Sequence, residues 1–369
     1  MKVVAFYLPQ FHTFPENDMW WGKGFTEWTN TKKARPLFDG HYQPHTPMNE
    51  NYYDLVLDKD VFSRQIHLAK EYGVDAFCYY HYWFANGKKL MEKPIERMLS
   101  DKSIDMPFCL CWANENWSRR WDGSETSILM EQNYGDRQGW HDHFEYLLKF
   151  FADERYLKDE HGWPILLIYK PQLIDTLDEM LSCWKKLAKE EGLPGICFVC
   201  QYPQYGDRIE EKFEHYVEFE PAATTGIPGR NFIKAWKISP KYAVEVGLTK
   251  LLQVTKIRTY KKYSYKDTVE ASIKRPIRNP KEWVGAFPGW DNTARRGKSA
   301  ILYHGSTPDL FKKYVVAQLK KSKLAGQEGV LFINAWNEWA EGAHLEPDEK
   351  HKMKYLEALK SAREEVNDE

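Results

Sequence analysis

Val330-Leu331-Phe332-Ile333-Asn334-Ala335 is an apolar run that passes directly into Trp336-Asn337-Glu338-Trp339-Ala340-Glu341, which is aromatic and acidic. An apolar run of this length predicts a strand covered on both faces, as in a parallel sheet. Seven similar runs precede it, at residues 3–8, 74–80, 108–113, 165–170, 196–201, 216–220 and 283–287. Helix-like stretches follow most of them, such as residues 60–72, 139–151, 177–190 and 348–365. Eight strands that alternate with helices predict a single (β/α)8 TIM barrel, an α/β fold, over residues 1–369.

An open, doubly wound sheet is the main alternative fold. Its dinucleotide-binding form needs a Gly-x-Gly-x-x-Gly turn after the first strand, whereas this strand ends in Leu8-Pro9-Gln10-Phe11-His12. Two connections are too long for bare barrel loops, residues 9–50 after strand 1 and residues 221–281 between strands 6 and 7. Loops of this length usually carry function or form extra subdomains.

The second long connection contains a basic insertion. Residues 222–281 hold 14 lysines and arginines but three acidic residues, in a chain whose net charge is −1. Such a segment is either an ordinary solvated surface or a patch that attracts an anionic polymer or a lipid-linked sugar. No nucleic-acid-binding module accompanies it, so we expect no nucleic-acid partner.

Nothing in the chain indicates a membrane segment or a disulfide framework. No stretch reaches the roughly 18 to 20 apolar residues that a membrane span needs. Residues 1–12 contain no apolar signal region, and we expect a cytoplasmic protein. Five of the six cysteines lie within apolar runs, which favours buried free thiols.

The strand ends should carry the active site, because a TIM barrel binds its substrate at the C-terminal face. Aromatic rings cover the apolar faces of sugars, and amides, carboxylates and histidines bond their hydroxyls. With 15 Trp, 22 Tyr and 19 Phe, the chain predicts a sugar cleft that takes up most of the surplus aromatic residues. The predicted substrate-binding residues are Tyr7, Gln10, His12, Trp28, Tyr80, His81, Tyr82, Trp83, Trp112, Asn114, Glu115, Lys170, Gln201, Glu220, Trp290, Asp291, Trp336 and Asn337.

Glu338 and Glu341 are the predicted catalytic residues. They are three positions apart, so both face the same way if the chain turns helically after the last strand. Two carboxyls that flank one bond are the usual equipment for glycoside hydrolysis. We expect both to be exposed at the mouth of the barrel. The alternative is that Glu341 only caps a helix and that Trp336 and Trp339 belong to the core.

Several motifs resemble those of glycoside hydrolase family 99 and of its bacterial WbsX-like relatives in polysaccharide biosynthesis. They are residues 332–342 with Leu345-Glu346-Pro347, Ala5-Phe6-Tyr7-Leu8-Pro9-Gln10-Phe11-His12, residues 20–28, Gly40-His41-Tyr42-Gln43-Pro44, Tyr80-His81-Tyr82-Trp83 and residues 112–117. The resemblance to the WbsX-like group spans nearly the whole chain. The resemblance to family 99 enzymes is strong around the last strand.

The resemblance implies a TIM barrel and retaining cleavage of an α-linked sugar without a cofactor. In family 99 the glutamate that matches Glu338 acts as base on the sugar's own 2-hydroxyl, which gives a 1,2-anhydro intermediate. The glutamate that matches Glu341 protonates the leaving oxygen and later activates water. This route implies an α-mannose or α-rhamnose type of glycan, here in cell-surface polysaccharide metabolism (O-antigen or capsule).

Three other interpretations of the residues remain open. Asn114-Glu115 with Glu338 is similar to the acid and nucleophile pair of the large retaining barrel clan. A second interpretation is that the protein is a glycosyltransferase or a non-catalytic carbohydrate-binding component of polysaccharide biosynthesis. The third interpretation is a metal enzyme, because several histidines could serve as metal ligands: His41, His45, His81, His141 and His143. We expect no metal, since an offset of two, as in His141 and His143, does not put ligands on one helix face.

Overall fold

The computed structural model describes residues 2–118, 128–201, 212–230, 236, 239–254, 259–277, 281–324 and 330–368. Eight parallel strands in these residues close into a barrel, because β1 pairs with β2 on one side and with β13 on the other. The (β/α)8 prediction is therefore confirmed. A short strand β3 (Lys89–Leu90) adds an antiparallel pair to the end of β2. The barrel strands are β1 (Lys2–Tyr7), β2 (Ala76–Trp83), β4 (Phe108–Trp112), β7 (Ile165–Ile168), β8 (Cys197–Cys200), β9 (His215–Val217), β11 (Glu282–Ala286) and β13 (Val330–Ile333).

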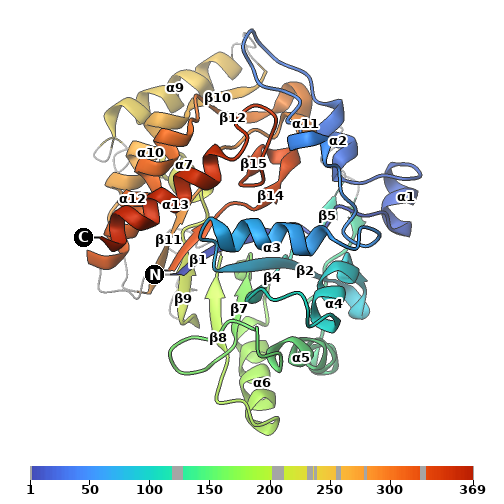
Figure 1. Cartoon of the computed structure of the whole chain (residues 1–369). Coiled ribbons are helices and arrows are strands. Elements are labelled where there is room, and N and C mark those ends of the chain that lie inside the picture. Colours follow the sequence, from blue (N-terminus) through green and yellow to red (C-terminus); the bar gives the residue numbers. More distant parts are fainter. Residues whose placement is uncertain are drawn as a thin grey trace.

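Helices follow the strands and surround the barrel (Figure 1). They are α3 (Val61–Glu71), α4 (Glu92–Ser100), α5 (Arg137–Phe151), α6 (Leu177–Glu190), α12 (Pro308–Leu324) and α13 (Lys354–Asn367). The first three predicted helices agree with α3, α5 and α6 within two residues. The last was predicted from residue 348, but α13 begins at Lys354. Asp348 pairs with Pro47 and with Lys352 in isolated bridges, and Lys352 has a positive φ of 53°, so this stretch cannot be helical.

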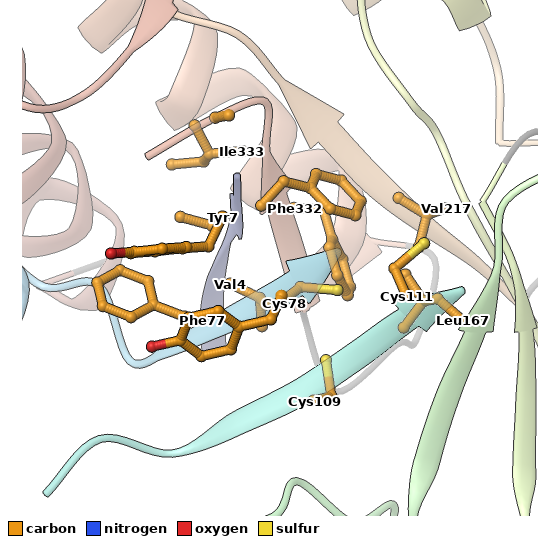
Figure 2. Packing of buried hydrophobic residues seen from close by; sticks show 14 of the residues in the cluster. Val4, Tyr7, Phe77, Cys78, Cys109, Cys111, Leu167, Val217, Phe332 and Ile333 are labelled. Atoms are coloured by element: carbon orange, nitrogen blue, oxygen red, sulfur yellow. The ribbon is translucent and has the colours of Figure 1, made fainter. Parts of the chain in front are cut away.

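The core consists of aromatic rings, aliphatic side chains and thiols from the strands (Figure 2). Phe6 lies over Tyr80, with ring centroids 5.7 Å apart. The cysteines predicted to be buried free thiols are so: Cys78, Cys109, Cys111, Cys197 and Cys200. Burial raises the pKa of the Cys78 and Cys111 thiols well above the usual value, which keeps them protonated.

The two long connections form additional structure at the barrel. The first contains α1 (Pro15–Trp21), α2 (Glu27–Lys33) and η1 (Met48–Glu50). The second contains α7 (Ala222–Arg230), α9 (Pro240–Val254), β10 (Lys261–Ser264) and α10 (Tyr265–Lys274). Strand β10 pairs in parallel with β12 (Ile301–His304), which follows β11 (Figure 1). Residues 231–235, 237–238, 255–258 and 278–280 of the basic insertion lie outside the described residues.

Arg275 anchors the basic insertion to the barrel. Its Nη2 lies 2.9 Å from Glu218 Oε1 and 2.8 Å from Glu220 Oε1, and all three side chains are at most 1% exposed. Glu220 also accepts hydrogen bonds from Ser272 and Thr224. Arg275, one of the basic residues of the insertion, is therefore buried and neutralised by carboxylates of the barrel. The Glu220 carboxylate, which was predicted to bind substrate, lies in this buried ion cluster.

Among the described residues, no helix combines the length and apolar character that crossing a bilayer demands.

Candidate active site

The chain turns sharply after β13. It forms β14 (Asn337–Glu338), the 3₁₀ helix η6 (Trp339–Glu341) and β15 (Ala343–His344). Asn337 fixes this turn against the end of β1, because its Oδ1 accepts from the Leu8 N–H at 2.7 Å and its Nδ2 donates to the Leu8 carbonyl at 3.1 Å. The helix ends at Gly342, where φ is 58° and an added Cβ would lie 3.0 Å from Asp291 Cβ. A glycine is therefore required at this position.

Glu338 and Glu341 converge on one guanidinium. Arg295, in the short helix α11 (Thr293–Arg296), donates through Nη2 to Glu338 Oε2 at 2.9 Å and through Nη1 to Glu341 Oε1 at 2.6 Å. Helix α11 follows β11, so both partners of this contact lie at the C-terminal ends of neighbouring strands. The helical turn assumed from the sequence thus brings the two predicted catalytic carboxyls together.

Glu27, at the start of α2, is a third carboxylate at the same guanidinium. Its Oε2 lies 3.2 Å from Arg295 Nη2, and its side chain is fully buried. Glu338 is only 6% exposed as well, so the expectation of an exposed pair holds for Glu341 alone, which is partly exposed. Because Arg295 and Glu27 cover Glu338, its carboxyl lies inside the protein rather than at the surface.

The buried position dominates the electrostatics of these groups. Burial raises the pKa of Glu338 to about 8, against the opposing charge of Arg295 and with further help from Glu341 and Glu27. Burial likewise raises the pKa of Glu27, and Arg295 opposes this shift. Burial alone would lower the pKa of Arg295, but the three carboxyls hold it well above the usual value. At neutral pH Glu338 is therefore mostly protonated, and Arg295 is charged.

Tyrosines from β2 lie around Glu338. Burial is the main cause of the raised pKa of Tyr80 and of Tyr82, and the charge of Glu338 adds to it in both. The Tyr80 hydroxyl accepts a hydrogen bond from Gln201 Nε2 at 3.1 Å. These three predicted residues therefore belong to the surroundings of the carboxyl cluster.

Other predicted residues are committed inside the protein. Tyr7 donates to Gln65 at 2.7 Å, Asn114 exchanges two bonds with the backbone of Lys170, and His81 Nε2 lies 2.9 Å from His143 Nε2. The indole N–H groups of Trp28 and Trp112 donate to the backbone carbonyls of Tyr53 and Trp83. The predicted substrate-binding side chains that are at most 5% exposed are Tyr7, Gln10, His12, Trp28, His81, Trp112, Asn114, Gln201, Glu220, Trp336 and Asn337.

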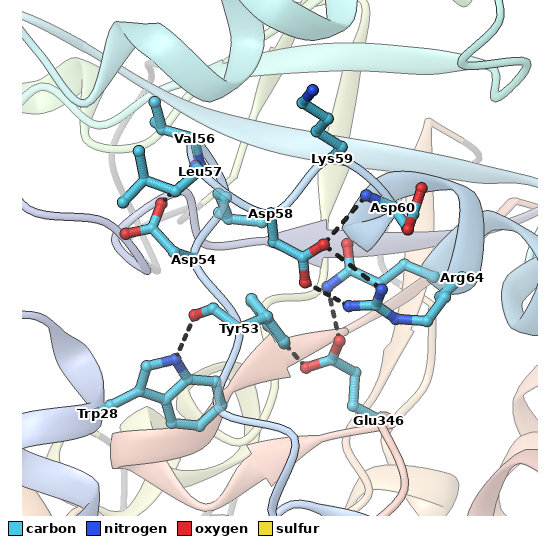
Figure 3. A network of polar contacts seen from close by, with 12 residues as sticks. Trp28, Tyr53, Asp54, Val56, Leu57, Asp58, Lys59, Asp60, Arg64 and Glu346 are labelled. Carbon is cyan, nitrogen blue, oxygen red and sulfur yellow. Dashed lines mark hydrogen bonds and ion pairs between the residues drawn. The ribbon is translucent and has the colours of Figure 1, made fainter.

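A polar network supports η6 from the side of the first long loop (Figure 3). Glu346 accepts from the Tyr53 hydroxyl at 2.8 Å. It also accepts from Trp339 Nε1 at 2.6 Å and from Gln65 Nε2 at 2.6 Å. Trp28 donates to the Tyr53 carbonyl at 2.8 Å. Burial raises the pKa of Glu346 to about 7, although all three donors oppose this shift. Trp28 and Trp339 are therefore held by hydrogen bonds in a buried network beside η6.

Two predicted residues in the first loop keep unused polar atoms. Gln10 Nε2 and both ring nitrogens of His12 are buried without a hydrogen-bond partner among the described residues. Glu115, in contrast, accepts from Lys170 Nζ at 2.5 Å, and both side chains are partly exposed. Glu115 follows β4, which lies across the barrel from β11, the strand that precedes Arg295. The Glu115 ion pair is therefore on the other side of the barrel from Arg295.

Three cavities lie near the predicted site residues. One of about 560 Å³ is lined by Trp83, Trp112, Tyr134 and His143, and one of about 600 Å³ by Tyr53, Gln65, Trp339 and Glu346. A third, of about 150 Å³, is lined by Trp290 and Asp291 together with several histidines. Side-chain groups that could hold a metal ion are His45 with His344 and Asp348, beside this third cavity, and His141 with Asp142 and Glu145 on α5.

Solved structures share the overall fold. The GH99 endo-alpha-mannosidase from Bacteroides thetaiotaomicron superimposes with a TM-score of 0.55 at 12% identity, over 99% of this chain and 97% of that one. A glycoside hydrolase-like protein gives a TM-score of 0.55 at 11% identity, over 98% and 93%. At such identity the likeness is one of fold.

Sequence relatives cover the same length of this chain. The uncharacterized protein WxcX of Xanthomonas campestris pv. campestris, strain B100, is 36% identical over 367 residues, which are 98% of this chain and 49% of that protein. Its counterpart in strain ATCC 33913 matches to the same extent. The chain spans about half the length of the curated relatives it matches. The family described as Glycosyltransferase WbsX matches residues 3–359, and the chain therefore belongs to the WbsX family.

Proposed function

We propose that the protein is a glycosidase-type enzyme that acts on an oligosaccharide or polysaccharide, with Glu338 and Glu341 as its catalytic carboxyls. The observation that carries the proposal is the convergence of these two carboxyls on Arg295 at the C-terminal face of the barrel. Paired carboxyls in different environments are what glycoside cleavage requires. The glycoside hydrolase fold of the structural neighbours supports the same reaction class.

The proposed reaction has two steps. Ionised Glu338 takes the proton of the sugar's 2-hydroxyl, whose oxygen attacks the anomeric carbon while the glycosidic bond breaks. Glu341 gives its proton to the leaving oxygen, which leaves a 1,2-anhydro sugar. Glu341 then takes a proton from water, water opens the anhydro ring, and Glu338 returns its proton to the 2-oxygen. Two inversions retain the anomeric configuration.

Arg295 has a defined part in this scheme. Its charge favours the ionised form of Glu338 against the effect of burial. A base with a pKa of about 8 is mostly protonated at pH 7, so kcat/KM should rise with pH up to about 8. If Glu338 were instead the proton donor, kcat/KM would fall above about pH 8. A pH profile on a cleaved substrate therefore assigns the role of Glu338.

The substrate we propose is an α-linked mannose-type or rhamnose-type glycan of the cell surface. The 1,2-anhydro route needs a 2-hydroxyl trans to the leaving group, which these sugars provide. The excess of basic residues in 222–281 fits an anionic or lipid-linked glycan, although Arg275 is taken up by the core. The aromatic residues Trp83 and Trp290, which line cavities, are the proposed ring-stacking positions.

The test is a screen of α-mannoside and α-rhamnoside oligosaccharides, with products followed by mass spectrometry. We expect cleavage by the wild-type chain and its loss in Glu338→Gln and Glu341→Gln, while Glu364→Gln, at an exposed position on α13, retains cleavage. Circular dichroism should show that all variants fold. Cleavage that persists in both Glu338→Gln and Glu341→Gln would overturn the proposal and favour a non-catalytic carbohydrate-binding protein.

The retaining-clan alternative, with Glu115 and Glu338, is less well supported. Glu115 pairs with Lys170, whereas Glu341 shares Arg295 with Glu338. A 2-fluoro sugar separates the two routes, because it lacks the 2-hydroxyl that the anhydro route needs. Trapping of a covalent glycosyl-enzyme with this sugar would contradict the anhydro route.

The family description favours a second candidate, glycosyl transfer. The same two carboxyls would then pass the sugar to an acceptor hydroxyl rather than to water. Adding an acceptor oligosaccharide to the cleavage assay distinguishes the two: longer products indicate transfer, and free sugar alone indicates hydrolysis.

A further inference from the structure

Three side chains with metal-binding atoms meet beside the catalytic turn. His45, in the loop after β1, and His344 and Asp348, in the segment after η6, each place one ligand atom within 4.8 Å of the others. They line the cavity of about 150 Å³ that also borders Asp291. The Asp291 N–H donates to the Glu341 carbonyl at 2.6 Å, so the cluster lies next to the catalytic segment.

The hydrogen bonds determine which ring nitrogens carry protons. His344 Nδ1 lies 2.9 Å from the Glu346 carbonyl oxygen, which can only accept, so Nδ1 carries the proton. His344 Nε2 therefore presents its lone pair. His45 Nδ1 lies 2.8 Å from that atom and donates to it. A histidine whose second nitrogen donates to a backbone carbonyl is the usual arrangement of a metal ligand.

Both imidazoles and the carboxylate are held in place. The His344 ring stacks on Trp339, with centroids 3.8 Å apart and planes 14° apart, and the His45 ring stacks on Tyr42 at 4.5 Å. Asp348 accepts from the His351 N–H at 2.5 Å. Burial lowers the pKa of His45 to about 3 and also lowers the pKa of His344, so both rings are neutral, as metal binding requires.

The two segments are joined at the cluster by their backbones. Pro47 and Asp348 form an isolated bridge, and the Glu349 N–H donates to the Thr46 carbonyl at 2.9 Å. The three ligand atoms are thus placed by hydrogen-bonded backbone and not by freely moving loops. Preorganised ligands of this kind lower the cost of binding an ion.

We propose that His45 Nδ1, His344 Nε2 and a carboxylate oxygen of Asp348 bind one divalent transition-metal ion, with a further coordination position open to the cavity. Two imidazole nitrogens and one carboxylate suit Zn²⁺ and its neighbours in the first transition row. On binding, the proton of His45 moves from Nδ1 to Nε2, so the charge of the ring does not change. The two nitrogens separate from 2.8 Å to about 3.3 Å, as tetrahedral Zn²⁺ geometry requires.

The other histidine-containing group provides the matched control. His141, Asp142 and Glu145 are all exposed on α5, where carboxylates and imidazoles gather without a metal in many proteins. Loss of metal binding on changing His141 would therefore indicate adventitious surface binding. His41 lines the same cavity but is already held between Asp291, at 2.5 Å, and the Leu37 N–H.

The experiment uses the full chain without a histidine tag, stripped with a chelator. Zn²⁺ is titrated calorimetrically, and Co²⁺ binding is followed by its visible absorption. We expect one tightly bound ion per chain and the strong absorption of tetrahedral Co²⁺. His45→Gln, His344→Gln and Asp348→Asn should weaken binding by at least about tenfold to 100-fold, the scale of changes at metal sites, while His141→Gln should not.

Folding of each variant is checked by circular dichroism before the titration. His45 is only partly buried, so His45→Gln should fold even where His344→Gln does not. The proposal is overturned if the wild-type chain binds no stoichiometric ion, if His45→Gln binds like the wild type, or if His141→Gln abolishes binding.

Discussion

Arg295 donates to Glu338 across 2.9 Å in a contact where the two side chains are 14% and 9% exposed. A guanidinium and a carboxyl in such surroundings attract strongly, but each loses its hydration. The result is a carboxyl with a pKa of about 8, held by a group that stays charged at every pH of interest. Burial therefore raises the pKa of the proposed base, this contact with Arg295 opposes the shift, and both contribute to the pH dependence of folding.

Removing the guanidinium should make folding sensitive to alkali. In Arg295→Met, Glu338 and Glu27 stay buried without a positive partner, so their folded-state pKa values rise further. The folded state then keeps protons that the unfolded chain releases, and stability falls as pH rises. We expect a loss of about 3 to 5 kcal/mol at pH 9, the cost of breaking a buried pair, and a smaller loss at pH 5. Melting curves at the two pH values measure this.

The neighbouring exposed Arg296 provides the control for that experiment. Arg296→Met removes the same charge from the same short helix without touching the carboxyl cluster. Equal losses at pH 5 and pH 9 in Arg295→Met would contradict the assigned ionic contact.

Glu338→Gln should flatten the pH dependence of stability. The pKa of Glu338 is raised from 4.5 to about 8 in the folded state. Between these values the folded protein holds a proton that the unfolded chain has lost, so each rise in pH disfavours folding. The contribution of Glu338 lowers the free energy of unfolding by about 1.4 kcal/mol per pH unit within this window. Urea denaturation from pH 5 to pH 8 should show a smaller loss of stability in the variant than in the wild type, because the variant keeps only the contributions of Glu346 and Glu27, whose pKa values are also raised.

A surface carboxyl controls for the loss of one charge in this series. Glu364 is exposed on α13, and Glu364→Gln is the matched substitution. If Glu338→Gln and the wild type lose stability in parallel between pH 5 and pH 8, the raised pKa is wrong.

The barrel could be predicted because its strands are buried on both faces. Such strands appear as nearly continuous apolar runs, and all eight runs correspond to barrel strands. The start of α13 was placed too early, since nothing in residues 348–353 shows that Asp348 pairs with the distant Pro47. Contacts between remote segments leave no local pattern.

The absence of a local pattern for remote contacts also explains why the sequence did not predict Arg295 and Glu27 as members of the site. The Glu338 and Glu341 pair follows from a local offset of three, but Arg295 and Glu27 are 268 residues apart and meet only through barrel closure. Trp28, Trp112 and Trp336 were predicted to bind substrate, and all three are at most 5% exposed. A tryptophan beside polar residues has the same sequence pattern whether its N–H bonds a ligand or, as for Trp28, an internal carbonyl.

Arg275 should be essential for stability although it lies in the basic insertion. Arg275→Met would leave Glu218 and Glu220 buried with one less cation, at a cost of about 3 to 5 kcal/mol. Replacing Glu220 as well, in Arg275→Met with Glu220→Gln, should recover part of this loss. Chemical denaturation of the single and double variants measures the coupling, with exposed Lys274→Met as control. A change below about 0.5 kcal/mol in Arg275→Met would show that the cluster is unimportant.

Gly285, in the middle of β11, should tolerate no side chain. An added Cβ would lie 1.8 Å from the Glu218 carbonyl oxygen and 2.9 Å from its carbon, and both are backbone atoms. The strands cannot separate easily, because the Glu218 N–H donates to the Trp283 carbonyl at 2.9 Å and Gln318 donates to the Gly285 carbonyl at 2.6 Å. We therefore expect Gly285→Ala to cost about 2 to 4 kcal/mol of unfolding free energy, as overpacking against backbone does.

The control is Gly247→Ala in α9. The added Cβ meets nothing within 4 Å, so this substitution should stabilise the chain by up to about 1 kcal/mol. Equal melting temperatures for the two alanine variants would refute the close approach of β9 and β11 that directs the chain toward Arg295.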